Sequence, residues 1–272
     1  TSGATILTDI EVVPHGLLFW RSQTHLLGGM GFLTLTVIFL PHGMGGLRLF
    51  RAESSPGQVI TKERFIPRNR DTMVWLWGIY MALNLLETIL LCAGGMTLFD
   101  SLCHSFGTVS TSGYSPWNAS IGHYNNPYFD GVIIVFMLLA GINFSLHYQM
   151  LRGKTLVFWQ DSECRFFFGA LALITLVVSL DIFRSVYETI GEALRYGAFQ
   201  VVSIVTTTGF ATADYEQWPA MSQLILLVCM FLGASAGSTG GGMKCLRIML
   251  CFKYCYKELF SLIHPHAVSH VK

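Results

Sequence analysis

Three short segments of the chain combine hydroxyl side chains with a glycine. They are Thr1, Ser2 and Gly3; Thr111, Ser112 and Gly113; and Thr207, Thr208 and Gly209. Each segment offers main-chain carbonyl and side-chain hydroxyl oxygens and carries no charge. Such oxygens replace the hydration shell of a monovalent cation, and potassium is the ion that this arrangement suits. Glycine has no Cβ, so it lets the backbone turn a carbonyl into directions that strain other residues.

The second and third segments belong to a longer internal repeat. When Gly113 is placed on Gly209, Ser110 to Tyr114 superpose on Thr206 to Phe210, hydroxyl on hydroxyl and aromatic on aromatic. Another glycine follows 28 residues after the glycine of each segment, at positions 31, 141 and 237. These matches predict a repeated unit of helix, re-entrant half-helix, loop and helix. We expect residues 1–70 to hold the end of a first repeat, 71–164 a second repeat and 165–272 a third.

The composition requires a membrane around these units. The 272 residues are 52% hydrophobic and only 12% charged, whereas soluble domains contain about 25% charged residues. A water-soluble domain is thereby excluded, and an all-α polytopic membrane protein is predicted. About 20 apolar helical residues cross the hydrocarbon core, and the spans expected on this basis are His25–Leu40, Asp71–Thr97, Phe129–Met150, Arg165–Tyr187 and a last one from Pro219.

Two apolar segments, Phe99–Val109 and Glu192–Val205, are too short to cross and directly precede the hydroxyl and glycine loops. Non-helical backbone at membrane depth is tolerated only where it is buried in protein or lines a water-filled path. A half-helix that ends at mid-membrane directs the negative end of its dipole there, which favours a cation. The pattern therefore predicts a cation pore.

The basic residues indicate the orientation. Fourteen of the 17 lie in three regions, and only Arg21, Arg184 and Arg195 lie elsewhere. By the positive-inside rule, the loops 43–70 and 152–162 and the C-terminal end are expected to be cytoplasmic, with 116–126 and 213–219 outside.

A stretch of small residues interrupts the last span. It contains Gly233, Ser235, Gly237, Ser238, Thr239, Gly240, Gly241 and Gly242 and is followed by Lys244. Small residues also permit close helix packing in membranes, but so many glycines disfavour a helix, and we expect a movable loop that gates the pore. Gly233 to Gly237 also match GxSxG, so an intramembrane serine hydrolase that uses Ser235 with His104 or His147 is the alternative function.

Two further features carry no clear assignment to a site. Glu87 is an acidic residue inside an expected span, and a hydrogen-bonding role in the structure is favoured over an ion site, although its role stays open. The seven cysteines give no disulfide pattern, and Cys255 with His264, His266 and His270 does not match zinc-ligand spacing. We therefore expect no transition metal and no cofactor in this chain.

Several strings in the chain resemble the membrane subunit of the Trk/Ktr/HKT superfamily of potassium transporters, most closely its TrkH type. They are TSGATILTD, HSFGTVSTSGYS, GINFSLHYQMLRG, VVSIVTTTGFATAD and GASAGSTGGGMK. The resemblance implies four helix, pore-helix and helix repeats around one potassium pathway, with Gly3, Gly113 and Gly209 as filter glycines and an intramembrane loop below them. In plant relatives a serine at the first of these positions accompanies sodium transport, so Gly3 indicates potassium.

The resemblance also implies how the protein works in the cell. By this resemblance the protein is expected not to be an enzyme and not to bind nucleic acid. It forms a homodimer in a bacterial plasma membrane, which is the inner membrane of a Gram-negative cell, and carries a cytoplasmic nucleotide-binding regulatory ring of the TrkA kind. The chain lacks the helices before the first filter loop and the fourth repeat, so we expect it to be an internal piece of a longer protein. Channel-like conduction and coupling to sodium or protons both stay open.

Overall fold

The computed structural model describes residues 5–31, 69–154 and 156–263. Within these segments the chain is helical, and its only extended pairings are two isolated bridges, Phe183 with Tyr187 and Leu232 with Met243. The predicted all-α fold is therefore confirmed. The elements are α1 (His15–Gly29), α4 (Asn69–Ala93), α5 (Leu98–Val109), η2 (Ser120–His123), α6 (Pro127–Gly141), α7 (Phe144–Leu151), α8 (Val157–Gln160), α9 (Ser162–Ile182), α10 (Ile190–Val205), η3 (Tyr215–Gln217), α11 (Ala220–Cys229) and α12 (Cys245–Ile263).

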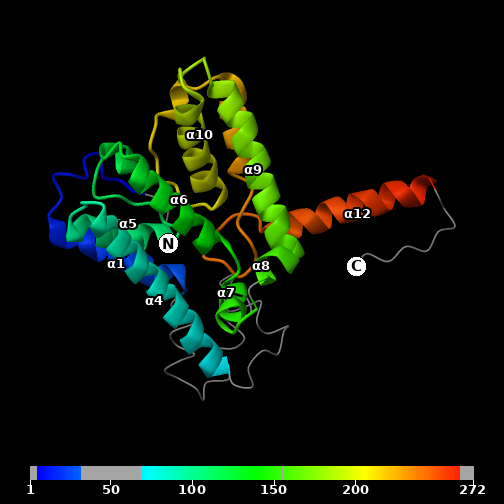
Figure 1. Ribbon diagram of the computed structural model, residues 1–272, viewed down its shortest axis with the longest axis horizontal. Coiled ribbons are helices and arrows are strands. Elements are labelled where there is room, and N and C mark those ends of the chain that lie inside the picture. The colour runs from blue at the N-terminus through cyan, green and yellow to red at the C-terminus, as the bar shows by residue number, and fades with distance from the viewer. Residues whose placement is uncertain (1–4, 32–68, 155, 264–272) are drawn as a thin grey trace.

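Two described helices are long and apolar enough to cross a membrane. They are α4, over Met73–Ala93, and α9, each with 21 residues in the apolar stretch. Large apolar side chains on both helices point away from the protein, such as Leu85 and Leu173, each 63% exposed. An apolar face of this kind is suited to lipid. The start of α4 and helix α7 lie at one end of the molecule, and the connection between α9 and α10 lies at the other (Figure 1).

The expected continuous span Phe129–Met150 is wrong, because the chain bends between α6 and α7 by 97°. Ile142 is extended at the break, and Asn143 caps α7 by accepting a hydrogen bond from the Ser145 amide at 2.9 Å. An asparagine that bonds its own downstream amide favours a new helix start over the continuation of the old helix. Hydropathy registers only the apolar length, so it does not detect this bend.

The first helix also differs from expectation, since α1 begins at His15 and not near His25. Pro14 directly precedes it, and proline fixes a backbone angle that suits a helix start. The helix ends at Gly29, and Gly31 has a positive φ of 75°. The predicted site residues of the first repeat, Thr1, Ser2 and Gly3, lie outside the described residues.

Two half-helices are present where the sequence predicted them. The first, α5, has 12 residues and the second, α10, has 16, which correspond to lengths of about 18 Å and 24 Å. Both begin with a capping box, in which Thr97 pairs with Asp100 and Thr189 with Glu192. Neither is long enough to cross a hydrocarbon core of about 30 Å, and each ends directly at a hydroxyl and glycine loop.

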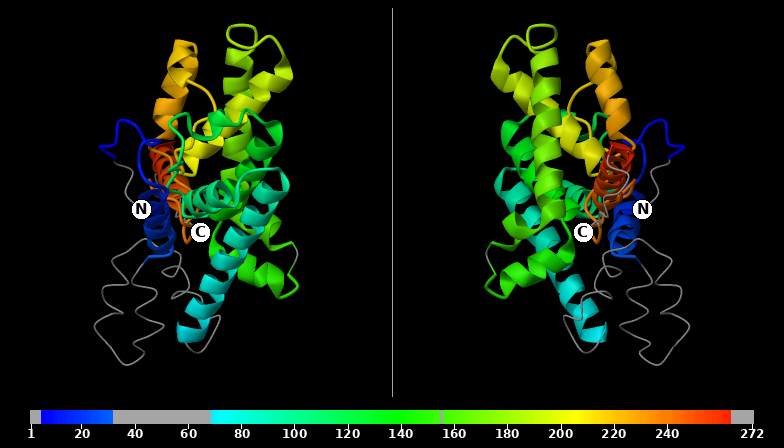
Figure 2. Two further views of the ribbon diagram at one scale, coloured as in Figure 1. Left: turned by 90° about the vertical axis from the view of Figure 1, so that its left-hand side faces the viewer. Right: turned by 90° about the vertical axis from the view of Figure 1, so that its right-hand side faces the viewer.

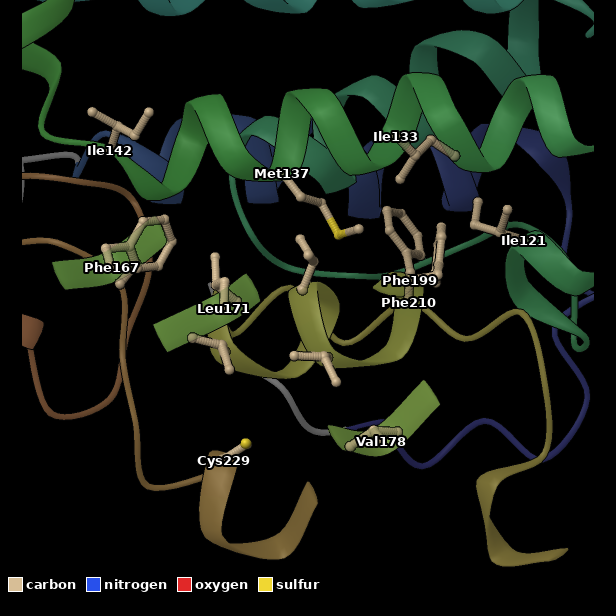
Figure 3. Close-up of a cluster of buried hydrophobic side chains, with 14 of the residues drawn as sticks. Ile121, Ile133, Met137, Ile142, Phe167, Leu171, Val178, Phe199, Phe210 and Cys229 are labelled. Atoms are coloured by element: carbon tan, nitrogen blue, oxygen red, sulfur yellow. The ribbon is translucent and has the colours of Figure 1, made fainter. Parts of the chain in front are cut away.

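Helix α6 contributes residues to two hydrophobic clusters and lies between α4 and α10 (Figure 1). On one side, Ile133 and Met137 belong to a cluster that also contains Leu171 of α9 and Phe199 of α10 (Figure 3). On the other side, Phe136 packs with residues of α1 and α4. The side views in Figure 2 show α10 and α11 in the upper half and the start of α4 at the lower end. Residues of both predicted repeats, 71–164 and 165–272, thus pack against α6. This shared packing fixes the positions of their two loops relative to each other.

Candidate functional site

The two described hydroxyl and glycine loops have the same backbone conformation. Thr111 and Thr207 have φ angles of 54° and 60°, and Gly113 and Gly209 have 69° and 88°. A positive φ is uncommon for a residue with a Cβ and rare for a β-branched one. The coincidence of two such positions in two loops 96 positions apart, Gly113 to Gly209, indicates one local structure used twice.

Hydrogen bonds to the half-helix ends hold each loop in this conformation. In the second repeat the amides of Ser112 and Gly113 donate to Gly107 O at 2.9 and 3.2 Å. In the third repeat the amides of Thr208 and Gly209 donate to Ser203 O at the same two distances. The amide donors are thus turned back toward the helix. No backbone donor in the described segments bonds the carbonyls of 111–113 or 207–209, so these oxygens remain available for a cation.

The loop hydroxyls have protein partners. Thr111 Oγ1 lies 2.7 Å from Ser110 O and 3.0 Å from Thr239 O, and Thr207 Oγ1 accepts the Gly241 amide at 2.6 Å. The hydroxyls of Ser112 and Thr208 bond neighbouring hydroxyls of their own loops. From the sequence, hydroxyls and carbonyls are equally good candidate ligands. Because these hydroxyls already have protein partners, the contacts favour the main-chain carbonyls as ligands. The hydroxyls of Thr111 and Thr207 instead bond the glycine-rich segment.

A cavity of about 490 Å³ lies between the two loops. Residues of both loops line it, together with Thr5, Tyr114 and, from the glycine-rich segment, Thr239 and Gly241. The cavity therefore brings together the second and third predicted filter loops and the predicted gating loop. Thr5, which follows the first predicted loop in sequence, borders the same space.

The segment from Gly233 to Lys244, here called the gating loop, is irregular, as predicted. It is fixed laterally to the end of α6, where the Ser235 amide donates to Gly141 O at 3.0 Å and Thr239 Oγ1 donates to Ala140 O at 3.2 Å. Its residues Thr239 and Gly241 also bond Thr111 and Thr207 of the two predicted filter loops. The gating loop therefore lies directly against both filter loops.

The hydroxyls of the gating loop hold it less than its backbone does. Ser238 Oγ bonds Ser235 O inside the loop at 2.6 Å, and Ser235 Oγ is buried with no partner among the described residues. Only Thr239 uses its hydroxyl to contact another element. The Ser238 hydroxyl bonds within the loop because short side chains inside a tight loop reach nearby backbone first.

The glycines of the gating loop permit close backbone approach. A Cβ on Gly233 would lie 2.3 Å from Gly241 O, and one on Gly240 would lie 2.9 Å from Thr206 O. Gly237 and Gly242 have positive φ angles of 81° and 67°. These contacts occur within the loop and against a filter loop. They explain the glycines better than helix packing does.

Lys244 and Glu163 hold the lower end of the gating loop. Lys244 is buried, and its Nζ donates to Gly240 O. Glu163, in the first turn of α9, accepts the amides of Ala236 and Leu246 at 2.6 and 3.1 Å. The sequence analysis missed Glu163, since an acidic residue in a first helical turn is the ordinary complement of the helix dipole.

Two pore-helix side chains at equivalent repeat positions fix the segments that follow the filter loops. His104 Nε2 lies 2.9 Å from Ser115 Oγ, and Gln200 Nε2 donates to Ala213 O at 2.9 Å. Both side chains are at most 1% exposed. The same offset that superposes the glycines also superposes His104 on Gln200, and this repeat arithmetic is the signal that could have identified them.

An ion pair joins α10 to α6. Arg195 Nε of α10 lies 2.6 Å from Asp130 Oδ2 of α6, whose side chain is 2% exposed. Arg195 and Tyr196 also reach Asn125 in the preceding loop. The pair fixes the second half-helix against α6.

Glu87 is fully buried on α4, and neither of its oxygens has a hydrogen-bond partner among the described residues. Its neighbour Asn84 bonds Tyr80 O and accepts the Ser105 hydroxyl of α5. Glu87 does not line the cavity between the filter loops. The role of Glu87 therefore remains a prediction.

The alternative function as a serine hydrolase finds no support in the geometry. A nucleophile elbow needs a strand before the serine and a histidine within hydrogen-bond reach. The described residue Ser235 follows helix α11, and its hydroxyl contacts no base. His104 bonds Asp100 O and Ser115, and His147 bonds Leu139 O. His264, His266 and His270 lie outside the described residues.

Comparisons with known proteins agree with this geometry. The family model of the TrkH cation transport proteins matches residues 1–272. The chain is 39% identical over 275 residues to the Trk system potassium uptake protein TrkH of Salmonella typhimurium and 41% identical over 275 residues to that of Halomonas elongata. Each match covers 100% of this chain and 56% of the relative, so the chain spans little more than half of their length.

A solved structure matches as well. The crystal structure of the potassium transporter TrkH from Vibrio parahaemolyticus superposes with a TM-score of 0.84 at 34% identity, over 99% of this chain and 55% of that one. The family match, the relatives and the shared fold all point to the same conclusion. The chain belongs to the TrkH family of cation transport proteins.

Proposed function

We propose that the protein of which this chain is part takes up potassium ions across a bacterial plasma membrane, the inner membrane in a Gram-negative cell. The single observation that carries the proposal is the doubled loop conformation around one cavity, with uncharged carbonyl oxygens left unbonded and the gating loop directly below. The relatives named above are potassium uptake proteins, which supports the same ion.

The chemistry of the proposed filter supports a monovalent cation. The residues that line the cavity contribute hydroxyl and carbonyl groups and no carboxylate. Divalent cations such as Ca²⁺ and Mg²⁺ prefer sites with carboxylate ligands. The C-terminal ends of α5 and α10 add the negative ends of two helix dipoles. The ion is coordinated by main-chain carbonyls of Thr111, Ser112 and Gly113 and of Thr207, Thr208 and Gly209. In the first repeat, Thr1, Ser2 and Gly3 complete the path.

The gating loop controls whether ions pass along this path. Its contacts with Thr111 and Thr207, and the presence of Thr239 and Gly241 in the cavity lining, support this role. We propose that a nucleotide-binding cytoplasmic subunit of the TrkA kind releases the loop, and that the membrane protein acts as a homodimer. The Trk system names of the relatives support a membrane subunit that works with other components.

The test uses the full-length protein in liposomes, with and without its regulatory subunit. Potassium influx that exceeds sodium influx, and that rises when the regulatory subunit and nucleotide are added, is the expected result. Equal influx of both ions in correctly inserted protein would contradict the proposed filter. A deletion of Ser235 to Gly241 should raise potassium influx without the regulatory subunit and keep the preference for potassium.

A further inference from the structure

Glu163 occupies a position that joins three elements. It lies in the first turn of α9, and α12 begins beside that end of α9 and runs away from the rest of the protein (Figure 1). The Glu163 side chain contacts Ala236 of the gating loop and Leu246 in the first turn of α12. One side chain therefore links α9 to the gating loop and to the start of α12.

A single oxygen of Glu163 makes both contacts. Oε1 accepts the Ala236 amide at 2.6 Å and the Leu246 amide at 3.1 Å. The Leu246 amide is one of the first four of α12, which have no partner within their own helix. Hydrogen bonds to a carboxylate are stronger than those between neutral groups. The carboxylate is thus well placed to hold the loop and the start of α12 at a fixed separation.

The charges around Glu163 agree with this arrangement. The N-terminal ends of α9 and α12 both face it, and each is the positive end of a helix dipole. Lys244, directly before α12, donates to Gly240 O inside the loop and lies near enough to Glu163 for the two charges to attract. Loss of the carboxylate would leave the start of α12 and Lys244 without this counter-charge, while Asp161 would still cap α9.

We infer that Glu163 is the positioning residue that keeps the gating loop across the path while α12 is at rest, and that releases it when α12 is displaced from below. This inference rests on the proposed function of the loop as a gate. A cytoplasmic partner that moves α12 pulls on Oε1 of Glu163 through the Leu246 amide, because Leu246 belongs to α12. The contact to Ala236, on the same oxygen, then weakens as the carboxylate follows α12.

The test compares Glu163→Ala with Asp161→Ala in the full-length protein. Asp161 provides the matched control, because its carboxylate caps the same helix through the Cys164 amide at 2.8 Å and forms no hydrogen bond with the gating loop among the described residues. We expect Glu163→Ala to raise potassium influx without the regulatory subunit by about tenfold, which corresponds to about 1.4 kcal/mol less preference for the closed loop. Asp161→Ala should lower thermal stability and leave this influx unchanged. Glu163→Gln keeps an acceptor oxygen and should fall between wild type and Glu163→Ala.

A second readout follows the loop directly. Cys245 is buried, and its thiol bonds Gly233 O of the loop. In a background without the other cysteines, an impermeant maleimide applied to the cytoplasmic side should modify Cys245 faster in Glu163→Ala than in wild type or Asp161→Ala. A residue with a purely structural role would lower the melting temperature of the protein without changing this rate.

The outcomes separate the two proposals. Unchanged influx and unchanged Cys245 modification in Glu163→Ala overturn the role of Glu163, and so does a loss of influx in folded protein. If the deletion of Ser235 to Gly241 still raises influx in that case, the gate stands and only its attachment to Glu163 is wrong. If the deletion also leaves influx unchanged, the gating function itself is wrong.

Discussion

Substitution of Gly113 by alanine should damage the filter far more than substitution of Gly209, although the two glycines are equivalent in the repeat. Both have a positive φ, 69° and 88°. A Cβ on Gly113 would lie 1.9 Å from Thr208 O and 2.8 Å from the Thr208 carbonyl carbon. A Cβ on Gly209 would meet nothing within 4 Å.

The magnitudes follow from two separate costs. The left-handed conformation costs a residue with a Cβ about 1–2 kcal/mol, and both variants incur that cost. At Gly113 the neighbouring carbonyl must also retreat, because real Cβ contacts essentially never fall below 3.0 Å, and the required movement is about 1 Å. Since the Thr208 carbonyl is one of the proposed ligands, its displacement changes ion coordination in the third repeat as well as the second.

The assay is competition between potassium and sodium in influx measurements, with thermal stability recorded in parallel. For Gly209→Ala we expect a fall in the potassium preference of at most about thirtyfold, the factor that about 2 kcal/mol allows. For Gly113→Ala we expect the preference to be lost. Ala211→Ser, which adds a hydroxyl close to the third filter loop without a positive φ, should behave like wild type. Equal effects of the two alanine substitutions, or unchanged preference in both, would refute the reasoning.

Three further predictions concern the surrounding structure. Asp130→Ala leaves the Arg195 guanidinium without its counter-charge in a partly buried site and should lower the unfolding free energy by about 3 kcal/mol, measured by thermal unfolding in detergent; no change would mean that water already solvates the pair. His104→Leu should reduce potassium preference more than His104→Gln, because glutamine occupies the equivalent position in the third repeat; identical influx ratios would argue against this support. Single cysteines at Ser55 and Ser120 in a Cys-free protein should react with impermeant maleimide from opposite sides of the membrane, and reaction from the same side would contradict the topology.

Much of the architecture follows from the sequence because it depends on local patterns. The membrane class follows from the scarcity of charge, and the two half-helices follow from apolar segments that are too short to cross. The shared frame of Gly113 and Gly209 predicted a repeated loop, and both positions have the positive φ that glycine permits. Each of these features is a property of a short stretch of chain. Family membership followed from the same strings and is confirmed by the family match.

The tertiary structure decided what depends on contacts between distant segments. The bend at Asn143, the attachment of the gating loop to α6 and the partners of the filter threonines join residues that are far apart in sequence or depend on a local cap. Glu163 was missed because its partners are main-chain amides 73 and 83 positions away, and amides leave no trace in a sequence pattern. The unequal space around Gly113 and Gly209 has the same origin. The internal repeat gives the two loops the same backbone conformation. Only their packing determines that a side chain added at Gly113, and not one added at Gly209, would meet the other loop.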